Sequence, residues 1–190
     1  MNYIAPGPAW NHVNLQADWK RKIKVLLGIN GMPLENEHIR EFQVLKWGRN
    51  IIKNSQPKHA VLEFLPLPSP SSHHWNYAAW TEHFTGIHCP QLYTRATYID
   101  QVFYDRINIL QKKIVKYRPK LVLFCSRDNC INLVFEALTH NVPIQVRNIG
   151  MHNCRIANHN GTLFIQTPHP NAFGLTNAYW AGLIQVIMEP

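Results

Sequence analysis

The chain has 190 residues, 46% of them hydrophobic, which suits a single folded domain with a substantial core. No apolar run approaches the roughly 20 residues that cross a bilayer, and the first residues lack the pattern of a secretory signal, so neither a membrane span nor export is expected. Nineteen Lys and Arg against eleven Asp and Glu give a net charge of +8, which favours a polyanionic partner such as nucleic acid.

The four cysteines and eleven histidines do not indicate a metal or a disulfide framework. Cys89, Cys125, Cys130 and Cys154 include no CxxC pair, and no HExxH motif occurs. We therefore expect no cofactor and no metal, and a reducing location such as the cytoplasm.

The N-terminal half is predicted to hold two strands that end in loops. Residues 1–19 read as an irregular arm, and residues 25–29 as a buried strand that ends at a Gly-containing turn. Residues 35–54 are compatible with a helix. Residues 60–65 read as a second strand, and the prolines of residues 66–72 exclude a helix after it.

The C-terminal half shows clearer periodicity. Residues 73–87 are predicted to be partly helical, and residues 99–117 form the clearest amphipathic helix, with basic residues near its end as the helix dipole prefers. The remaining predicted elements are a strand at 121–125, a helix at 130–138, a short strand or edge element at 143–146, a strand at 162–166 and a helix at 177–188.

This alternation predicts an α/β fold, a three-layer αβα sandwich with a central four-stranded parallel sheet, in one domain over residues 1–190. Ligands bind beyond the carboxyl ends of parallel strands. Four loops are therefore expected to meet at one crevice: residues 28–33, 66–72, 126–127 and 168–174.

These loops resemble the motifs of the uracil-DNA glycosylase superfamily, over roughly residues 23 to 188. Gly28-Ile-Asn-Gly31 stands where the family has GQDPYH or GINPG after its first strand. His169-Pro-Asn-Ala-Phe-Gly174 stands where it has HPSPLS after its last strand. Residues 61–72 and 117–125 resemble the family's segments that lie between these two motifs. The resemblance implies a DNA glycosylase without a cofactor, acting on DNA as a monomer.

The resemblance also implies catalytic roles. His169 would donate a hydrogen bond to the leaving base, and Asn30 would hold the attacking water. Because an amide is not a strong base, Glu35 or Glu37 could supply a carboxylate there. Both also suit the first turn of a helix, where the dipole favours acidic residues.

Base and DNA contacts follow by the same resemblance. Phe173 would fill the gap left by a flipped base, or would pack on the last helix. Glu63 would read a base amino group or pair with Arg127, and the serines would contact phosphate or simply form a turn. The full set of expected base and DNA contacts is Gly28, Ile29, Gly31, Met32, Glu63, Phe64, Ser69, Ser71, Ser72, Arg127, Asn171 and Phe173.

The sequence departs from the family in ways that bear on the substrate. No proline follows Asn30 directly, and Glu63-Phe64 stands where the family has the asparagine that reads uracil. The expected activity is therefore excision of uracil or, more in keeping with these departures, of a modified pyrimidine, in DNA repair or in defence against phage with modified cytosine. The alternative is a non-catalytic nucleic-acid-binding module on the same scaffold.

Overall fold

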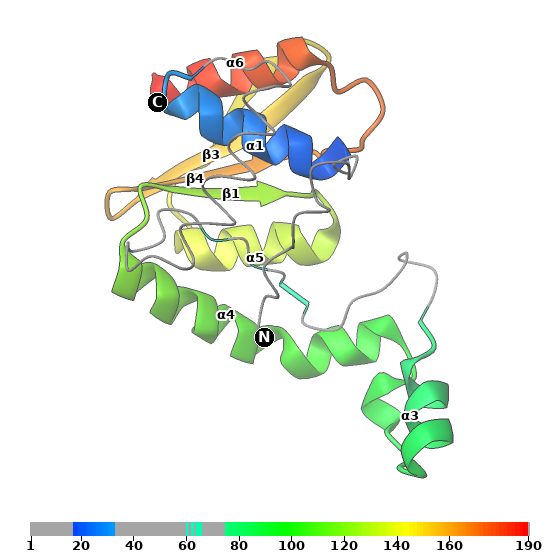
Figure 1. Cartoon of the computed structure of the whole chain (residues 1–190). Helices are drawn as coiled ribbons and strands as arrows, with labels where there is room; N and C mark the ends of the chain where they lie inside the picture. Colours follow the sequence, from blue (N-terminus) through cyan, green and yellow to red (C-terminus); the bar gives the residue numbers. More distant parts are fainter. Residues whose placement is uncertain (1–16, 33–59, 61, 63, 66–74, 190) are drawn as a thin grey trace, which may run out of the picture.

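The computed structural model of the chain describes residues 17–32, 60, 62, 64–65 and 75–189 (Figure 1). Its helices and strands, in chain order, are α1 (Ala17–Ile29), α3 (Tyr77–Thr85), the 3-10 helix η3 (Pro90–Leu92), α4 (Arg95–Tyr117), β1 (Leu121–Cys125), α5 (Asn129–Thr139), β2 (Gln145–Ile149), β3 (His152–His159), β4 (Thr162–Thr167) and α6 (Asn177–Met188).

The four strands form one sheet in the order β1-β4-β3-β2. Only β1 and β4 are parallel, and β4 with β3 and β3 with β2 are antiparallel. The α/β class and the four-stranded sheet of the described residues agree with the sequence-based expectation, but the purely parallel sheet was wrong. The sheet is mixed.

Two tight turns explain the antiparallel half. Asn160 and Gly161 both have positive φ, 51° and 77°, the geometry of a two-residue Asn-Gly hairpin, and they join His159 directly to Thr162. Gly150, with φ 60°, lies between β2 and β3 in the same way. Strands joined so closely must pair antiparallel, because a parallel crossover needs a dozen or more residues. The strand β3 escaped prediction because its sequence, HNCRIANH, is mostly polar.

Helices cover both faces of the sheet, α1 and α6 on one side and α4 and α5 on the other (Figure 1). The side chains of each strand alternate between the two sides, as the pleat requires. On β4, Leu163 and Ile165 belong to the core under α1 and α6, and Phe164 belongs to the core against α4 and α5. The three layers follow from this alternation.

The strand predicted at residues 25–29 is instead the end of helix α1. Gly31, with φ 65°, ends it: the N–H of Gly31 donates to the carbonyl of Gly28, and the N–H of Met32 to that of Leu27, both over 3.0 Å. These two hydrogen bonds form a Schellman motif, which ends helices and favours glycine at this position. A short apolar run before Gly fits a helix end as well as a strand end, and only the packing decides between them.

The second predicted strand is also not formed in the part of residues 60–65 that the structure describes. Phe64 is buried there in a T-shaped contact with the Phe103 ring, 5.7 Å between centroids, and its carbonyl accepts a hydrogen bond from Arg106 Nε over 2.7 Å. Residue 64 therefore belongs to the core beside α4. The helix predicted at residues 35–54 lies outside the described residues.

The helices of the C-terminal half were predicted well. Helix α6 has the predicted bounds, and α5 differs by one residue at each end. Helix α4 begins earlier than predicted, at Arg95, because the Thr94 hydroxyl accepts the Thr97 N–H over 3.0 Å and caps it.

Candidate functional site

The β4–α6 loop, residues 168–176, follows the carboxyl end of strand β4, which pairs in parallel with β1, and its exposed side chains include three that could contact a ligand. Pro168 and Pro170 are buried and anchor it, and the N–H of Ala172 donates to the His169 carbonyl over 2.8 Å. The three exposed side chains are His169, Asn171 and Phe173, and Phe173 is 96% exposed. An exposed Phe on an anchored loop suits contact with a planar partner.

The ring of His169 is oriented by its own loop. The backbone N–H of Asn171 donates to His169 Nδ1 over 3.1 Å. An Nδ1 that accepts a hydrogen bond carries no proton in the neutral ring, so this bond assigns the proton to Nε2. The exposed imidazole is thereby prepared to donate a hydrogen bond from Nε2.

Two basic side chains of α1 hold the loop and the start of α6. Arg21 donates to the carbonyl of Pro170 and, over 2.9 Å, to Oδ1 of Asn171. Lys24, one helical turn later, donates to Oδ1 of Asn177 over 2.9 Å. All these acceptors are neutral, so the positive charge of both residues stays available to an anionic ligand beside the loop.

Below the loop, Arg127 and Tyr179 meet at the start of β3. Arg127 donates to the carbonyl of Asn153 over 2.5 Å, and the Tyr179 hydroxyl donates to the same oxygen over 3.4 Å. The buried Nε of Arg127 has no hydrogen-bond partner in the described part of the chain. Arg127 was expected near Glu63, which lies outside the described residues.

Nucleophilic chemistry by the thiol and phenol in this cluster is disfavoured. Burial raises the pKa of Tyr179, and the neighbouring Cys154 adds to the effect. Burial also raises the pKa of Cys154, although the Arg127 guanidinium opposes the shift. Both groups therefore stay protonated and uncharged near neutral pH, and a neutral thiol is a poor nucleophile.

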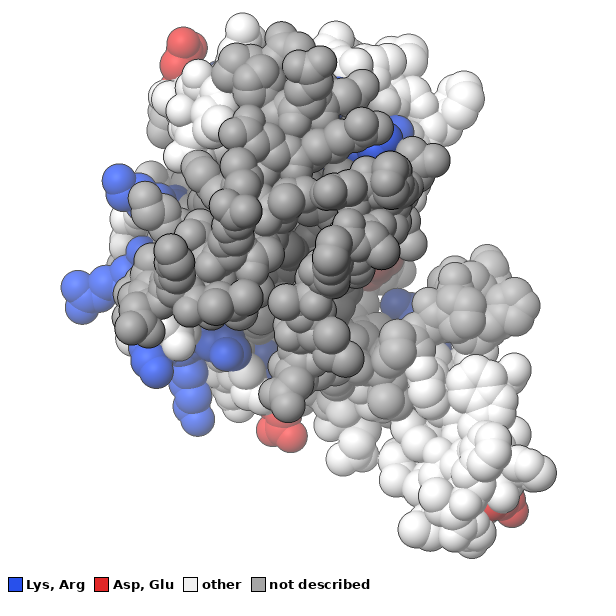
Figure 2. All heavy atoms as spheres, viewed as in Figure 1, with Lys and Arg blue, Asp and Glu red and all other residues white. Residues whose placement is uncertain are grey.

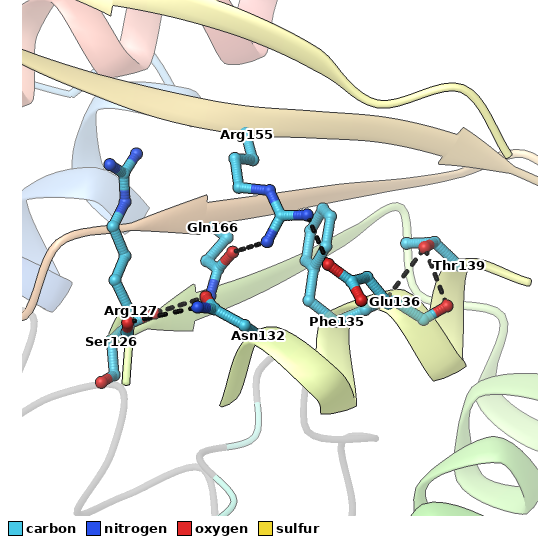
Figure 3. A network of polar contacts seen from close by, with 8 residues as sticks. All are labelled: Ser126, Arg127, Asn132, Phe135, Glu136, Thr139, Arg155 and Gln166. Atoms are coloured by element: carbon cyan, nitrogen blue, oxygen red, sulfur yellow. Dashed lines mark hydrogen bonds and ion pairs between the residues drawn. The ribbon is translucent and has the colours of Figure 1, made fainter. Parts of the chain in front are cut away.

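A polar network fixes the strand ends from which these loops start (Figure 3). The Gln166 side chain, fully buried on β4, donates to the Ser126 carbonyl over 2.9 Å and to Asn132 Oδ1 over 2.8 Å. Its Oε1 accepts from Arg155 over 3.0 Å, and Arg155 also pairs with Glu136 over 2.8 Å. The sequence signal for this network was a glutamine inside an apolar strand, and it was missed.

The residues of the first predicted motif lie elsewhere. Helices α1 and α6 run side by side in the same direction, since Arg21 meets the loop before α6 while Gly28 packs on Ile184. Asn30 follows the last turn of α1, nine residues beyond Arg21 and therefore about 14 Å along the helix axis. Its side chain donates to the Leu26 carbonyl over 2.6 Å.

The predicted crevice is thus assembled only in part. The structure places Arg127 and the β4–α6 loop at the same end of the sheet. Asn30 does not lie beside His169, and neither do its sequence neighbours Gly28, Ile29, Gly31 and Met32. Phe64 is a core residue. The other expected site residues lie outside the described residues: Glu35, Glu37, Glu63, Ser69, Ser71 and Ser72.

Comparisons with known proteins identify no relative. No protein-family model, no curated protein and no solved structure matches the chain. Among the described residues no helix is long and apolar enough to span a bilayer, and no three His, Cys, Asp or Glu side chains cluster in a way that could bind a metal ion.

Proposed function

We propose that the chain binds DNA through the β4–α6 loop and hydrolyses the N-glycosidic bond of a flipped pyrimidine, as a monofunctional DNA glycosylase. The observation that carries the proposal is the 3.1 Å hydrogen bond from the Asn171 N–H to His169 Nδ1, which leaves Nε2–H as an exposed donor. The exposed Phe173 and the basic side chains of α1 beside the loop support it.

Hydrolysis of the N-glycosidic bond is favoured by such a hydrogen-bond donor. Water adds its oxygen to C1′ of the sugar and releases one proton to a nearby base or to solvent, the bond from C1′ to the base breaks, and the base leaves with the electron pair and takes up a proton from solvent. Negative charge gathers on a pyrimidine carbonyl oxygen as the bond breaks. A hydrogen bond from His169 Nε2 to that oxygen stabilises the transition state more than the ground state.

Phe173 contributes to binding in this proposal. A base outside the stack leaves a gap in the duplex, and an apolar ring that enters the gap offsets the lost stacking. Because the Phe173 side chain is already exposed, its entry into DNA would not remove any packing from the protein core.

Asn30 has no role in this proposal, because its side chain lies far along α1 from the loop and donates to the helix backbone. Glu35 and Glu37 keep that proposed role and lie outside the described residues. The proposed substrate is uracil or a modified pyrimidine, and the modified base is favoured by Glu63-Phe64 standing where the resembled family has asparagine.

A second candidate function is DNA binding without excision. The separation of Asn30 from His169 favours it, since an intact donor without a positioned water would hold a base but not release it. The two candidates share the loop and differ only in hydrolysis.

One assay separates these functions. The protein is incubated with duplex and single-stranded DNA that contains uracil, hydroxymethylcytosine or glucosylated cytosine, and alkali-labile abasic sites are counted. A glycosylase produces such sites, and His169→Ala lowers the rate about 100-fold or more. His83→Ala, at an exposed histidine of α3, is the matched control and keeps the rate. Binding without abasic sites on any substrate would establish the non-catalytic function instead.

A further inference from the structure

A cavity lies at the end of the sheet opposite the β4–α6 loop. It has a volume of about 350 Å³ and is enclosed by the end of α4, the end of α5, the β3–β4 turn and the start of β4. Thr162 of β4 lines it, whereas His169 follows the opposite end of the strand, about 17 Å away along the strand. The cavity is therefore separate from the β4–α6 loop, and its volume is within the range of small-molecule sites.

The walls of the cavity combine an apolar side with a cationic, aromatic rim. Ile114, Leu138 and Phe164 line the apolar side. On the rim, the rings of His140 and His159 lie 4.7 Å apart between centroids and are tilted by 32°. An offset pair of imidazoles offers flat faces on which a heteroaromatic ring can stack, and ring nitrogens that can bond to it.

Arg118 adds a cation that nothing in the described chain neutralises. Arg118 lines the cavity, and its side chain has no hydrogen bond or ion pair with the described residues. Lys112, Lys113, Lys116 and Lys120 surround it in the sequence, and basic side chains gather where α4 ends (Figure 2). A planar guanidinium with free donors is suited to bind a phosphate through two hydrogen bonds.

The backbone around the cavity is also unusual. Two non-glycine residues of its lining, Arg118 and His140, have left-handed φ of 44° and 52°, outside the Asn-Gly turn that accounts for Asn160. Arg118 and His140 follow the last turns of α4 and α5, where glycine is the favoured residue. A large side chain such as that of Arg118 adds backbone strain at such a position, which makes it a candidate for a functional residue.

From these features we infer that the cavity binds a nucleoside monophosphate. Arg118 holds its phosphate, the His140–His159 pair stacks on its base, and the apolar wall contacts the rest of the ring system. The inference does not depend on glycosylase activity, because none of these residues belongs to the β4–α6 loop.

The test is calorimetric titration of the full chain with adenosine 5′-monophosphate, with adenosine as the ligand lacking phosphate. We expect the nucleotide to bind with a dissociation constant below about 1 mM, and Arg118→Gln to weaken binding about tenfold or more through the lost charge-assisted bonds. Val115→Glu, at an exposed position of the lining, should weaken it through charge repulsion, and Val115→Gln should not.

Three results would overturn the inference: no binding of the nucleotide at concentrations of about 1 mM or more, equal affinity for adenosine, or unchanged affinity in Arg118→Gln. Phe173→Ala tests independence from the proposed DNA site and should bind the nucleotide as the parent chain does. A loss of nucleotide binding in Phe173→Ala would mean that the ligand occupies the β4–α6 loop, and would equally overturn the inference. Melting curves verify that each variant is folded.

Discussion

Arg21 on α1 donates a hydrogen bond to Oδ1 of Asn171, 150 residues later in the chain. Asn171 in turn donates its backbone N–H to Nδ1 of His169. The guanidinium therefore holds the residue that orients the proposed catalytic imidazole. The segment before Asn30 was expected to be a strand with a catalytic residue at its end, but it belongs to helix α1, which contacts the β4–α6 loop through its first half.

Replacing Arg21 should loosen the β4–α6 loop. Arg21→Ala removes the bonds to Asn171 and to the Pro170 carbonyl together with one positive charge, so we expect faster amide hydrogen exchange across residues 169–175 and weaker DNA binding. Lys112→Ala removes the same charge from α4, far from the loop, and is the control for charge alone. Unchanged exchange in Arg21→Ala would show that the loop does not depend on this contact.

Phe173 should contribute to DNA affinity through its ring. Since a base stacked on an aromatic side chain is worth about 1–3 kcal/mol, Phe173→Ala should weaken binding by about 5-fold to 150-fold, and Phe173→Trp should restore it. Fluorescence anisotropy with a labelled oligonucleotide measures both. Phe84→Ala, on α3, removes another largely exposed Phe and should leave the affinity within about twofold. Equal losses in the two alanine variants would argue against a specific role for the loop.

Replacing Gln166 should destabilise the fold strongly, because three other polar groups depend on its side chain for hydrogen bonds. Gln166→Leu leaves the Asn132 oxygen and the Ser126 carbonyl without their donor and removes an acceptor from Arg155. Buried polar groups that lose partners cost about 1–3 kcal/mol each, so we expect a loss of roughly 2–4 kcal/mol in the free energy of unfolding.

Urea denaturation measures that loss. Gln185→Leu is the matched control, since Gln185 is exposed on α6, and it should change stability by less than about 0.5 kcal/mol. A loss below about 1 kcal/mol in Gln166→Leu would mean that water or a rearranged side chain replaces the missing bonds.

The thiol of Cys130 should make stability depend on pH in alkaline solution. Burial, and then the nearby Asp128, raise the pKa of Cys130 from 9.0 to about 11. The unfolded chain loses this proton at lower pH than the folded chain, so the stabilisation is present below about pH 9 and is lost as pH rises toward 11. Urea denaturation between pH 8 and 10.5, roughly the range below and inside this window, should show a shallower decline for Cys130→Ala than for the parent chain. Parallel declines would contradict a raised pKa.

The sequence was most informative where local signals and tertiary packing agree. The amphipathic pattern of α4 and the apolar strands β1 and β4 were predicted because each element has one dominant period or run. Position 169 was correctly expected in a loop after the last strand, and the bounds of α6 were predicted as they are formed.

The failures share one physical cause, which is that pairing partners are not encoded locally. The apolar run Val25 to Ile29 before Gly31 is compatible with a strand and with a helix, and its packing against α6 decides for the helix. The mostly polar strand β3 is paired on both sides and buries only Cys154, Ile156 and Ala157 in the core, too few to give a strand signal in the sequence. The pairing of Asn30 with His169 assumed that both residues follow parallel strands, and it failed because residues 25–29 are the end of a helix while His169 follows β4.

The packing of α1 on α6 can be tested at Gly28. A Cβ at this position would lie 2.2 Å from Cδ1 and 2.8 Å from Cγ1 of Ile184, so Gly28→Ala must displace the Ile184 side chain. Alanine is the better helix former by about 1 kcal/mol, yet overpacking costs about 1–3 kcal/mol, and we expect net destabilisation. Ile184→Val in the same chain makes room and should return part of the loss, giving a coupling energy of at least about 0.5 kcal/mol in a double-mutant cycle of urea denaturation. If residues 25–29 formed a strand away from α6, the two substitutions would be additive.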